Sequence, residues 1–456
     1  MARDVRLIRS PMSVAGMVLT TVSAVLFLVV FLADLFGLHS NPYIGLVFFV
    51  MLPGVFVLGL LLIPLGAWLE HRRRRAGKAP SEVRWPQIDL NNADHRRAAV
   101  AIFTLTLVNV VIVSLGAYRG VEYMDSVQFC TSACHSVMKP EGTAHQNGPH
   151  ARVACVACHV GSGATSFAKA KLSGTRQLLA VTRGSYSRPT GAPARNMVPA
   201  RDTCEQCHWP EELHGDKLQR VVEYSDDEKN TESVTTLQLH VGGGSERLGI
   251  ASGIHWHMNL ANEIEYIATD DKRQVIPYVR LKDQAGKIRE YVADGVTAEQ
   301  LAKGQRRRMD CMDCHNRPAH TMAATAERSV NTAMSRGEIP ALLPFVHREA
   351  VKVLKAEYPT QEAASDAIGA SLRQFYRGSY PALSASHGPD VDKAVAATQR
   401  IYQRNVFPEM RVGFGTYPNN IGHIDSAGCF RCHDDSHKAT DGTKIGQDCE
   451  SCHKIE

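Results

Sequence analysis

The twelve cysteines of this chain constrain its structure more strongly than any other feature of the sequence. They fall into six pairs, and in every pair a histidine directly follows the second cysteine. Two residues separate the cysteines in five of the pairs, and three residues separate them in the first pair. The pairs are Cys130 and Cys134, Cys155 and Cys158, Cys204 and Cys207, Cys311 and Cys314, Cys429 and Cys432, and Cys449 and Cys452.

This repeated pattern indicates covalent haem attachment. C-x-x-C-H is the signature of a c-type haem, in which the two thiols form thioether bonds to the porphyrin and the adjacent imidazole binds the iron. Structural zinc would not require a histidine after every pair, and disulfide bonds would not favour this spacing. We therefore expect six haems. Their proximal iron ligands are the motif histidines His135, His159, His208, His315, His433 and His453.

Three apolar runs predict a membrane anchor. Residues 14–33, 43–69 and 98–118 contain no charged side chain, and each run is long enough to cross a hydrocarbon core about 30 Å thick. Arginines cluster before the first run and between the second and third. The positive-inside rule then places the N-terminus in the cytoplasm and the chain after residue 118 in the periplasm. We expect a multi-pass protein of a bacterial inner membrane, in contact with the lipid bilayer and not with nucleic acid.

The expected fold is a mainly α membrane protein. Three transmembrane helices precede a periplasmic multihaem domain of short helices and irregular chain, with a small β-hairpin insertion at 274–281 and 287–292. Amphipathic helices are predicted at 321–335, 349–356 and 361–376, and the haems are expected to form much of the core. The predicted divisions are a two-span membrane region (1–97), the third span with three haem motifs (98–210), an insertion (211–305), the fourth motif with helices (306–410) and a two-haem module (411–456).

The sixth iron ligands are less constrained, because more histidines remain than six irons need. Met138 is a candidate ligand of the first iron, where methionine would raise the haem potential, and its alternative role is packing. The lone histidines His214, His347 and His387 are expected to be exposed. The histidine candidates are His150, His320, His423, His437, and the pair His255 and His257 on either side of a tryptophan.

Three segments resemble the NapC/NirT/NrfH family of membrane-anchored quinol dehydrogenases, which are multihaem c-type cytochromes. They are the run 98–118 leading into Cys130, the segment 149–159 around the second motif, and the segment 311–320 around the fourth. The resemblance covers about residues 98–210 and 305–325. It implies that the haem nearest the membrane takes electrons from quinol.

The family pattern also implies particular ligands. By this resemblance, Met138 is the sixth ligand of the haem nearest the membrane. His150 then serves the haem on His315, and His320 serves the haem on His159.

A lysine and a nearby acid shape the quinol pocket of this family. Lys169 or Lys171 matches the lysine, whereas Gln177 stands where the acid is expected. Glu122 or Asp125, before the first motif, is the substitute proton acceptor that this departure leaves open.

Other departures from the family pattern indicate a larger architecture. The family core has one anchor and four haems, whereas this chain has three apolar runs, six motifs and about 100 residues between the third and fourth motifs. This plan resembles the ImcH-type inner-membrane cytochromes of bacteria that respire extracellular metals.

These features predict a quinol dehydrogenase. It would oxidise menaquinol or ubiquinol from the membrane pool and reduce a periplasmic c-type cytochrome or reductase in anaerobic or extracellular respiration. Two alternatives remain open, a terminal multihaem reductase of a small oxyanion and an electron-wire or anchor subunit of a larger complex.

Overall fold

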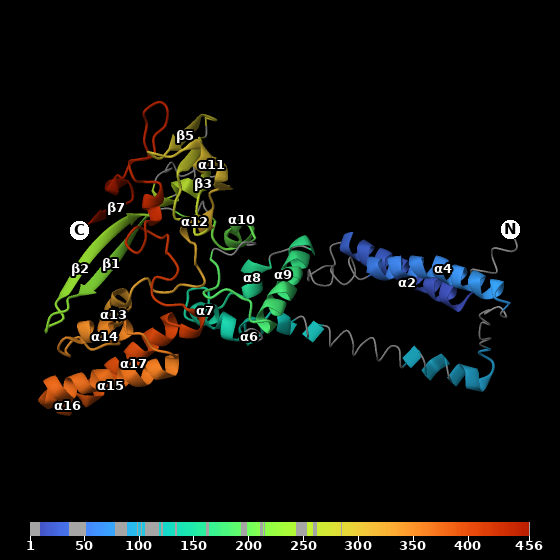
Figure 1. Ribbon diagram of the computed structural model, residues 1–456, viewed down its shortest axis with the longest axis horizontal. Coiled ribbons are helices and arrows are strands. Elements are labelled where there is room, and N and C mark those ends of the chain that lie inside the picture. The colour runs from blue at the N-terminus through green and yellow to red at the C-terminus, as the bar shows by residue number, and fades with distance from the viewer. Residues whose placement is uncertain are drawn as a thin grey trace. The chain divides into compact units, whose positions relative to one another are not determined.

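The chain divides into two compact units. One is Met1–Ser126 with Val160–Arg176, and the other is Val127–His159 with Gln177–Glu456. Figure 1 shows the elements of both. The computed structural model describes residues 10–35, 52–77, 89–97, 99–101, 103–104, 118–119, 122–132, 135–160, 164–192, 198–209, 213, 215–242, 253–258, 262–283 and 285–455.

The first unit contains two apolar helices, α2 (Pro11–Leu35) and α4 (Leu52–Arg75), which lie side by side (Figure 1). Small residues let their backbones approach. A Cβ added at Gly59 would lie 2.8 Å from the carbonyl oxygen of Gly16, and the Ser13 hydroxyl donates a hydrogen bond of 2.9 Å to the carbonyl of Ile63. Contacts of this kind, between small residues and through a hydroxyl, are typical of helix pairs in membranes.

Replacing Gly59 by leucine is expected to separate these two helices. The added side chain would meet the Thr20 hydroxyl, 2.5 Å from the Cβ position, and overpacking of this kind costs about 1–3 kcal/mol. Chemical denaturation in detergent micelles measures the loss of stability. Gly54→Leu is the control, because a Cβ at Gly54 has no atom within 4 Å.

The structure shows the predicted transmembrane helices in part. Within the described residues, Gly54–Arg73 in α4 is the helix long and apolar enough to cross a membrane, with a mean hydropathy of 1.7, and Pro11–Leu26 is a shorter apolar helix. The α4 helix continues past the end of the predicted run because arginine is a good helix former. Residues 43–51 and most of the run 98–118 lie outside the described residues, so three transmembrane helices are not shown.

Within the described residues, the second unit contains every strand and the helices from α6 onward, of which it shares α9 with the first unit. Its helices are α6 (Val127–Ser132), α7 (His135–Gln146), α8 (Cys155–His159), α9 (Ala164–Thr182), α10 (Ala200–Thr203), η2 (Cys204–Gln206), η5 (Ile254–Met258), α11 (Ala298–Lys303), α12 (Cys311–Cys314), α13 (Ala326–Ser335), α14 (Val346–Leu354), α15 (Gln361–Ser379), α16 (Pro381–Ser386), α17 (Gly388–Asn405), η6 (Pro408–Met410), η7 (Gly428–Arg431) and η8 (Cys449–Ser451).

Two small antiparallel sheets accompany these helices. One has the strand order β1 (Asp216–Tyr224), β2 (Glu232–His240), β7 (His453–Ile455), and the other the order β5 (Ile288–Val292), β4 (Tyr278–Lys282), β3 (Glu263–Ala268), β6 (Gln305–Arg308). The predicted hairpin is present, because β4 and β5 pair with Lys282 opposite Ile288. The long hairpin β1–β2 was not predicted; most of its side chains are exposed or half-buried, so its apolar alternation is weak.

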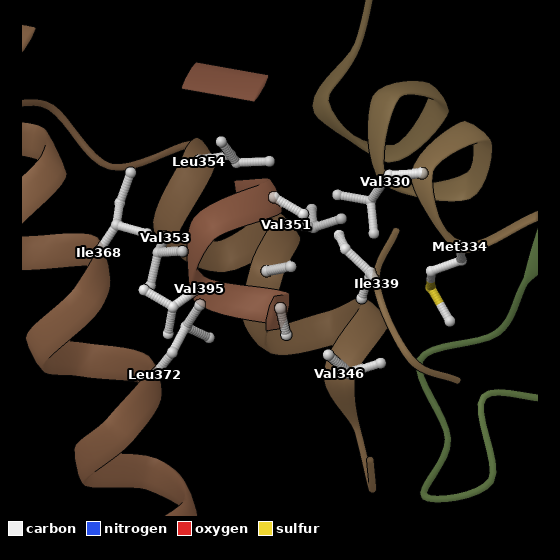
Figure 2. Packing of buried hydrophobic residues seen from close by; sticks show 14 of the residues in the cluster. Val330, Met334, Ile339, Val346, Val351, Val353, Leu354, Ile368, Leu372 and Val395 are labelled. Carbon is white, nitrogen blue, oxygen red and sulfur yellow. The ribbon is translucent and has the colours of Figure 1, made fainter. Parts of the chain in front are cut away.

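The helices α13 to α17 form a side-chain core of their own, which we call the helical module (326–405). Val330, Ile339, Leu343 and Ile368 are fully buried there, and Figure 2 shows the packing around several of them. The helix at α13 begins later than predicted because Thr325 caps it, accepting a hydrogen bond from the backbone N–H of Arg328. The expectation that haems supply the core does not hold for this part of the chain.

Candidate haem sites

Each C-x-x-C-H motif folds into one helical turn. The second and fourth motifs form α8 and α12, and the other three form η2, η7 and η8. In the fourth motif, the backbone N–H of His315 donates a 2.8 Å hydrogen bond to the carbonyl of Cys311. Residues three and four apart share one face of a helical turn. The turn therefore presents two thiols and one imidazole together, as haem attachment requires.

The motif histidine of each C-x-x-C-H sequence faces a second histidine. The partner comes from a distant segment in most cases, and every pair contains one proximal ligand candidate. The ring centres are 6.1 Å apart for His159 and His320, His208 and His150, His315 and His255, and His453 and His423, and 5.8 Å apart for His433 and His257.

These separations fit a haem iron between the two rings. A metal–imidazole bond is about 2 Å long, so two imidazoles on opposite sides of one iron have ring centres about 6 Å apart. All five observed values agree with this spacing. When bound, such a haem accepts and releases one electron at a potential that its axial ligands help to set.

The partner histidines are oriented by backbone carbonyls. The Nδ1 atom of His150 lies 3.1 Å from the carbonyl of Pro318, and that of His320 lies 3.1 Å from the carbonyl of Glu141. A carbonyl oxygen only accepts, so Nδ1 carries the proton and Nε2 keeps its lone pair for a metal. Burial also lowers the pKa of His159 and His320, which keeps both imidazoles neutral.

Successive motifs lie close to one another at their cysteines. The thiol of Cys155 is hydrogen-bonded to Cys130, which lowers the pKa of Cys155 to about 7. The thiol of Cys204 is hydrogen-bonded to Cys311, which lowers the pKa of Cys204 to about 6. Three further pairs are near enough for the charge of one thiol to raise the pKa of the other: Cys158 and Cys204, Cys314 and Cys429, and Cys429 and Cys452. The motifs therefore follow one another in space in the order of the sequence.

A buried polar network locks the fourth motif to the fifth. Asp313, inside the fourth motif, is 3% exposed and accepts a 2.5 Å hydrogen bond from the Tyr266 hydroxyl. Arg431, inside the fifth motif, donates 2.7 Å and 2.9 Å hydrogen bonds to the carbonyls of Asp313 and Arg273. Asp313 and Arg431 were not predicted to contribute, because they occupy the variable positions of their motifs.

The family pattern and the structure differ over His150. The pattern assigns it to the haem on His315, whereas the structure places its ring opposite His208 and places His255 opposite His315. His320 lies opposite His159, as the pattern implies. Glu141 on α7 was not predicted to contribute, yet its carboxylate accepts a 2.8 Å hydrogen bond from Arg317 beside His320.

Other candidate histidines have structural partners. His437 is 1% exposed, and both of its ring nitrogens are engaged, with Asp434 at 2.8 Å and with the carbonyl of Ile276 at 2.7 Å. His347, expected to be exposed, is buried beside Asp226 because α14 packs against the β1–β2 turn. His387 is exposed and bonded to Asp390, and His214 lies outside the described residues.

The first motif is described in part. Cys130 lies in α6, and His135 is the first residue of α7. Cys134 lies outside the described residues. Met138 is half-buried on α7, one turn after His135. A residue three positions along a helix lies on the same face.

The predicted quinol-site residues occupy two segments. Lys169 and Gln177 are exposed on α9, and the position of Lys171 is two residues from Lys169 on the same helix. Residues two apart on an α-helix point about 200° apart, so positions 169 and 171 lie on different faces. Before the first motif, Glu122 accepts a 2.7 Å hydrogen bond from Arg119, and Asp125 is half-buried.

Comparison with known proteins identifies relatives of this chain. Residues 93–192 match the NapC/NirT cytochrome c family, N-terminal region. The chain is 41% identical over 449 residues to the cytochrome c-type protein ImcH of Geobacter sulfurreducens, covering 98% of this chain and 88% of that protein. No solved structure matches this chain.

Proposed function

This chain belongs to the NapC/NirT cytochrome c family, and from that membership we propose that it oxidises quinol and passes the electrons through six haems to a periplasmic redox partner. At a coarser level it is a membrane multihaem cytochrome of electron transfer that carries covalent c-type haem. The observation that carries the finer proposal is the set of five histidine pairs, each of which includes a motif histidine.

Paired histidines favour electron transfer over chemistry at the iron. Two histidines bound to one iron would leave it no open position, whereas a reductase of a small oxyanion needs an open position for its substrate. The five C-x-x-C-H motifs offer no such position within the described residues. The proximity of successive cysteines supports a single line of haems from the first motif to the sixth. The C-terminal haems are the proposed exit to a soluble cytochrome or reductase.

The donor is proposed to be menaquinol or ubiquinol in a bacterial inner membrane. Quinol releases two electrons and two protons, and each haem iron accepts one electron. The site therefore needs a cationic or hydrogen-bonding group for the quinone oxygen and a group that takes the protons to water. We assign the first role to Lys169 on α9, and the second to Glu122 or Asp125.

The membrane region is proposed to cross the bilayer three times, with the haem segment in the periplasm. The close pairing of α2 and α4 supports the first two crossings, and the apolar run 98–118 supplies the third. At the charged end of α4, the Arg72 guanidinium lies 5.1 Å from the centre of the Trp68 ring. Tryptophan and arginine favour the membrane–water boundary.

Met138→His is expected to lower the potential of the first haem. Histidine in place of methionine as sixth ligand stabilises the oxidised iron, so the midpoint potential falls. Spectroelectrochemical titration resolves this haem from the others. A titration curve identical to that of the unaltered protein would show that Met138 only packs against its neighbours.

The test of the proposal is reduction by quinol. The purified protein in detergent is mixed anaerobically with a menaquinol analogue, and the α-band of reduced haem is recorded. We expect rapid reduction of most of the haem that dithionite reduces. If dithionite reduces the haem and the quinol analogue leaves it oxidised, the proposal is wrong.

A further inference from the structure

The short helix η5 (Ile254–Met258) lies between the third and fourth motifs in sequence and carries two histidines around a tryptophan. We propose that His255 and His257 are the sixth ligands of two successive haems, those attached at the fourth and fifth motifs, so that one five-residue helix holds both. This inference rests on the proposed haem attachment and is independent of quinol oxidation.

The two side chains face different motifs. The His255 ring lies parallel to the His315 ring, with an interplanar angle of 3° and centres 6.1 Å apart. The His257 ring lies 5.8 Å from the His433 ring at an angle of 82°. A 3-10 helix has three residues per turn, so residues two apart point in clearly different directions. One helix can therefore reach two irons on different sides.

Both histidines are prepared for metal binding through Nε2. Nδ1 of His255 lies 2.9 Å from the carbonyl of Val241, and Nδ1 of His257 lies 2.8 Å from the carbonyl of Ile254. Each carbonyl accepts the Nδ1 proton, which directs the lone pair of Nε2 outward. This is the arrangement found for the partner histidines of the second and third motifs.

The helix is held firmly at both ends. Gly253 has a φ of +92°, and a Cβ there would lie 2.6 Å from the carbonyl oxygen of His240, so this turn requires glycine. Trp256 packs against the buried cluster of the second sheet, and Asn262 donates a 3.1 Å hydrogen bond to the Trp256 carbonyl. Cys432 of the fifth motif packs against the same cluster.

The helix thus lies between the fourth and fifth motifs and faces both of them. The Asp313–Arg431 contact already ties the fourth motif to the fifth on the polypeptide side. If η5 supplies both distal ligands, it holds the two haems in place on one side. The contact between their motifs then holds them on the other.

The experiment uses the full-length holoprotein in detergent with His255→Gly, His257→Gly and the double variant. Each single variant is expected to convert one low-spin haem to high-spin by electron paramagnetic resonance, and the double variant two. Added imidazole is expected to restore the low-spin signals. Haem content by pyridine haemochrome is expected to stay unchanged, because the cysteines hold the porphyrin. The control is His387→Gly, at an exposed histidine bonded to Asp390.

His255→Met and His257→Met provide a second measurement that does not depend on an open site. Each is expected to raise the potential of a different haem while keeping it low-spin. Low-spin signals and potentials unchanged in both sets of variants would overturn the proposal, as would both substitutions acting on the same haem. If quinol fails to reduce the unaltered protein, quinol is not the donor. The spin states and potentials of these variants do not depend on that result.

Discussion

Replacing Cys311 and Cys314 together by serine is expected to stop electrons at the third haem. The fourth motif lies next to the third at Cys204, and it contacts the fifth through the hydrogen bond from Arg431 to the Asp313 carbonyl, so it is the link between the two halves of the chain. With this haem missing, quinol should reduce the first three haems and leave the fifth and sixth oxidised. Reduction of a soluble acceptor should fall to the background rate. Stopped-flow absorbance and the mass of the haem-bearing chain measure both changes.

The matched variant removes the haem at the end of the line. Cys449→Ser with Cys452→Ser also deletes one haem, yet quinol should still reduce every haem that remains. Full reduction of the fifth and sixth haems in the protein without the fourth would contradict the linear order. Dithionite reduction of the same sample shows that those haems are intact.

Lys169→Met is expected to lower the rate of quinol oxidation by about 100-fold, the usual effect of removing one donor that stabilises developing charge on oxygen. Methionine keeps the length and apolar contacts of the lysine stem and removes its charge. Anaerobic kinetics with a menaquinol analogue measure the rate, and haem spectra and potentials should be unchanged.

Lys171→Met discriminates between the two lysines. Positions 169 and 171 lie on different faces of α9, so one pocket is expected to depend on one of them. A large effect at Lys171 with a normal rate for Lys169→Met would reverse the assignment. Normal rates in both variants would remove lysine from the quinol site.

Local features were predictable from the sequence, and long-range pairings were not. The motif turns at Cys155 and Cys311 follow from five consecutive residues, and the β4–β5 hairpin follows from two short alternating runs around a glycine. The pairing of His150 with His208 depends on how distant segments dock, which spacing does not encode. The family pattern supplied a different partner, the haem on His315.

The core of the helical module was also not predicted from the sequence. Six porphyrins were expected to replace a side-chain core, yet residues such as Leu343 and Ile368 bury fully against their own neighbours. The amphipathic patterns of α13, α14 and α15 were recognisable in the sequence. The packing of α17 against α15 was not predicted. Polar contacts such as that of Asn230 with the Leu343 carbonyl hold the β1–β2 turn to this module.

The helical module begins and ends at neighbouring points, since the backbone N–H of Ala323 donates a 2.8 Å hydrogen bond to the Asn405 side chain. About 80 residues therefore form a closed insertion between two motifs that lie close together. The apolar interior of this insertion consists mostly of its own side chains. Loss of the haems at the last two motifs is therefore expected to leave this part of the chain folded.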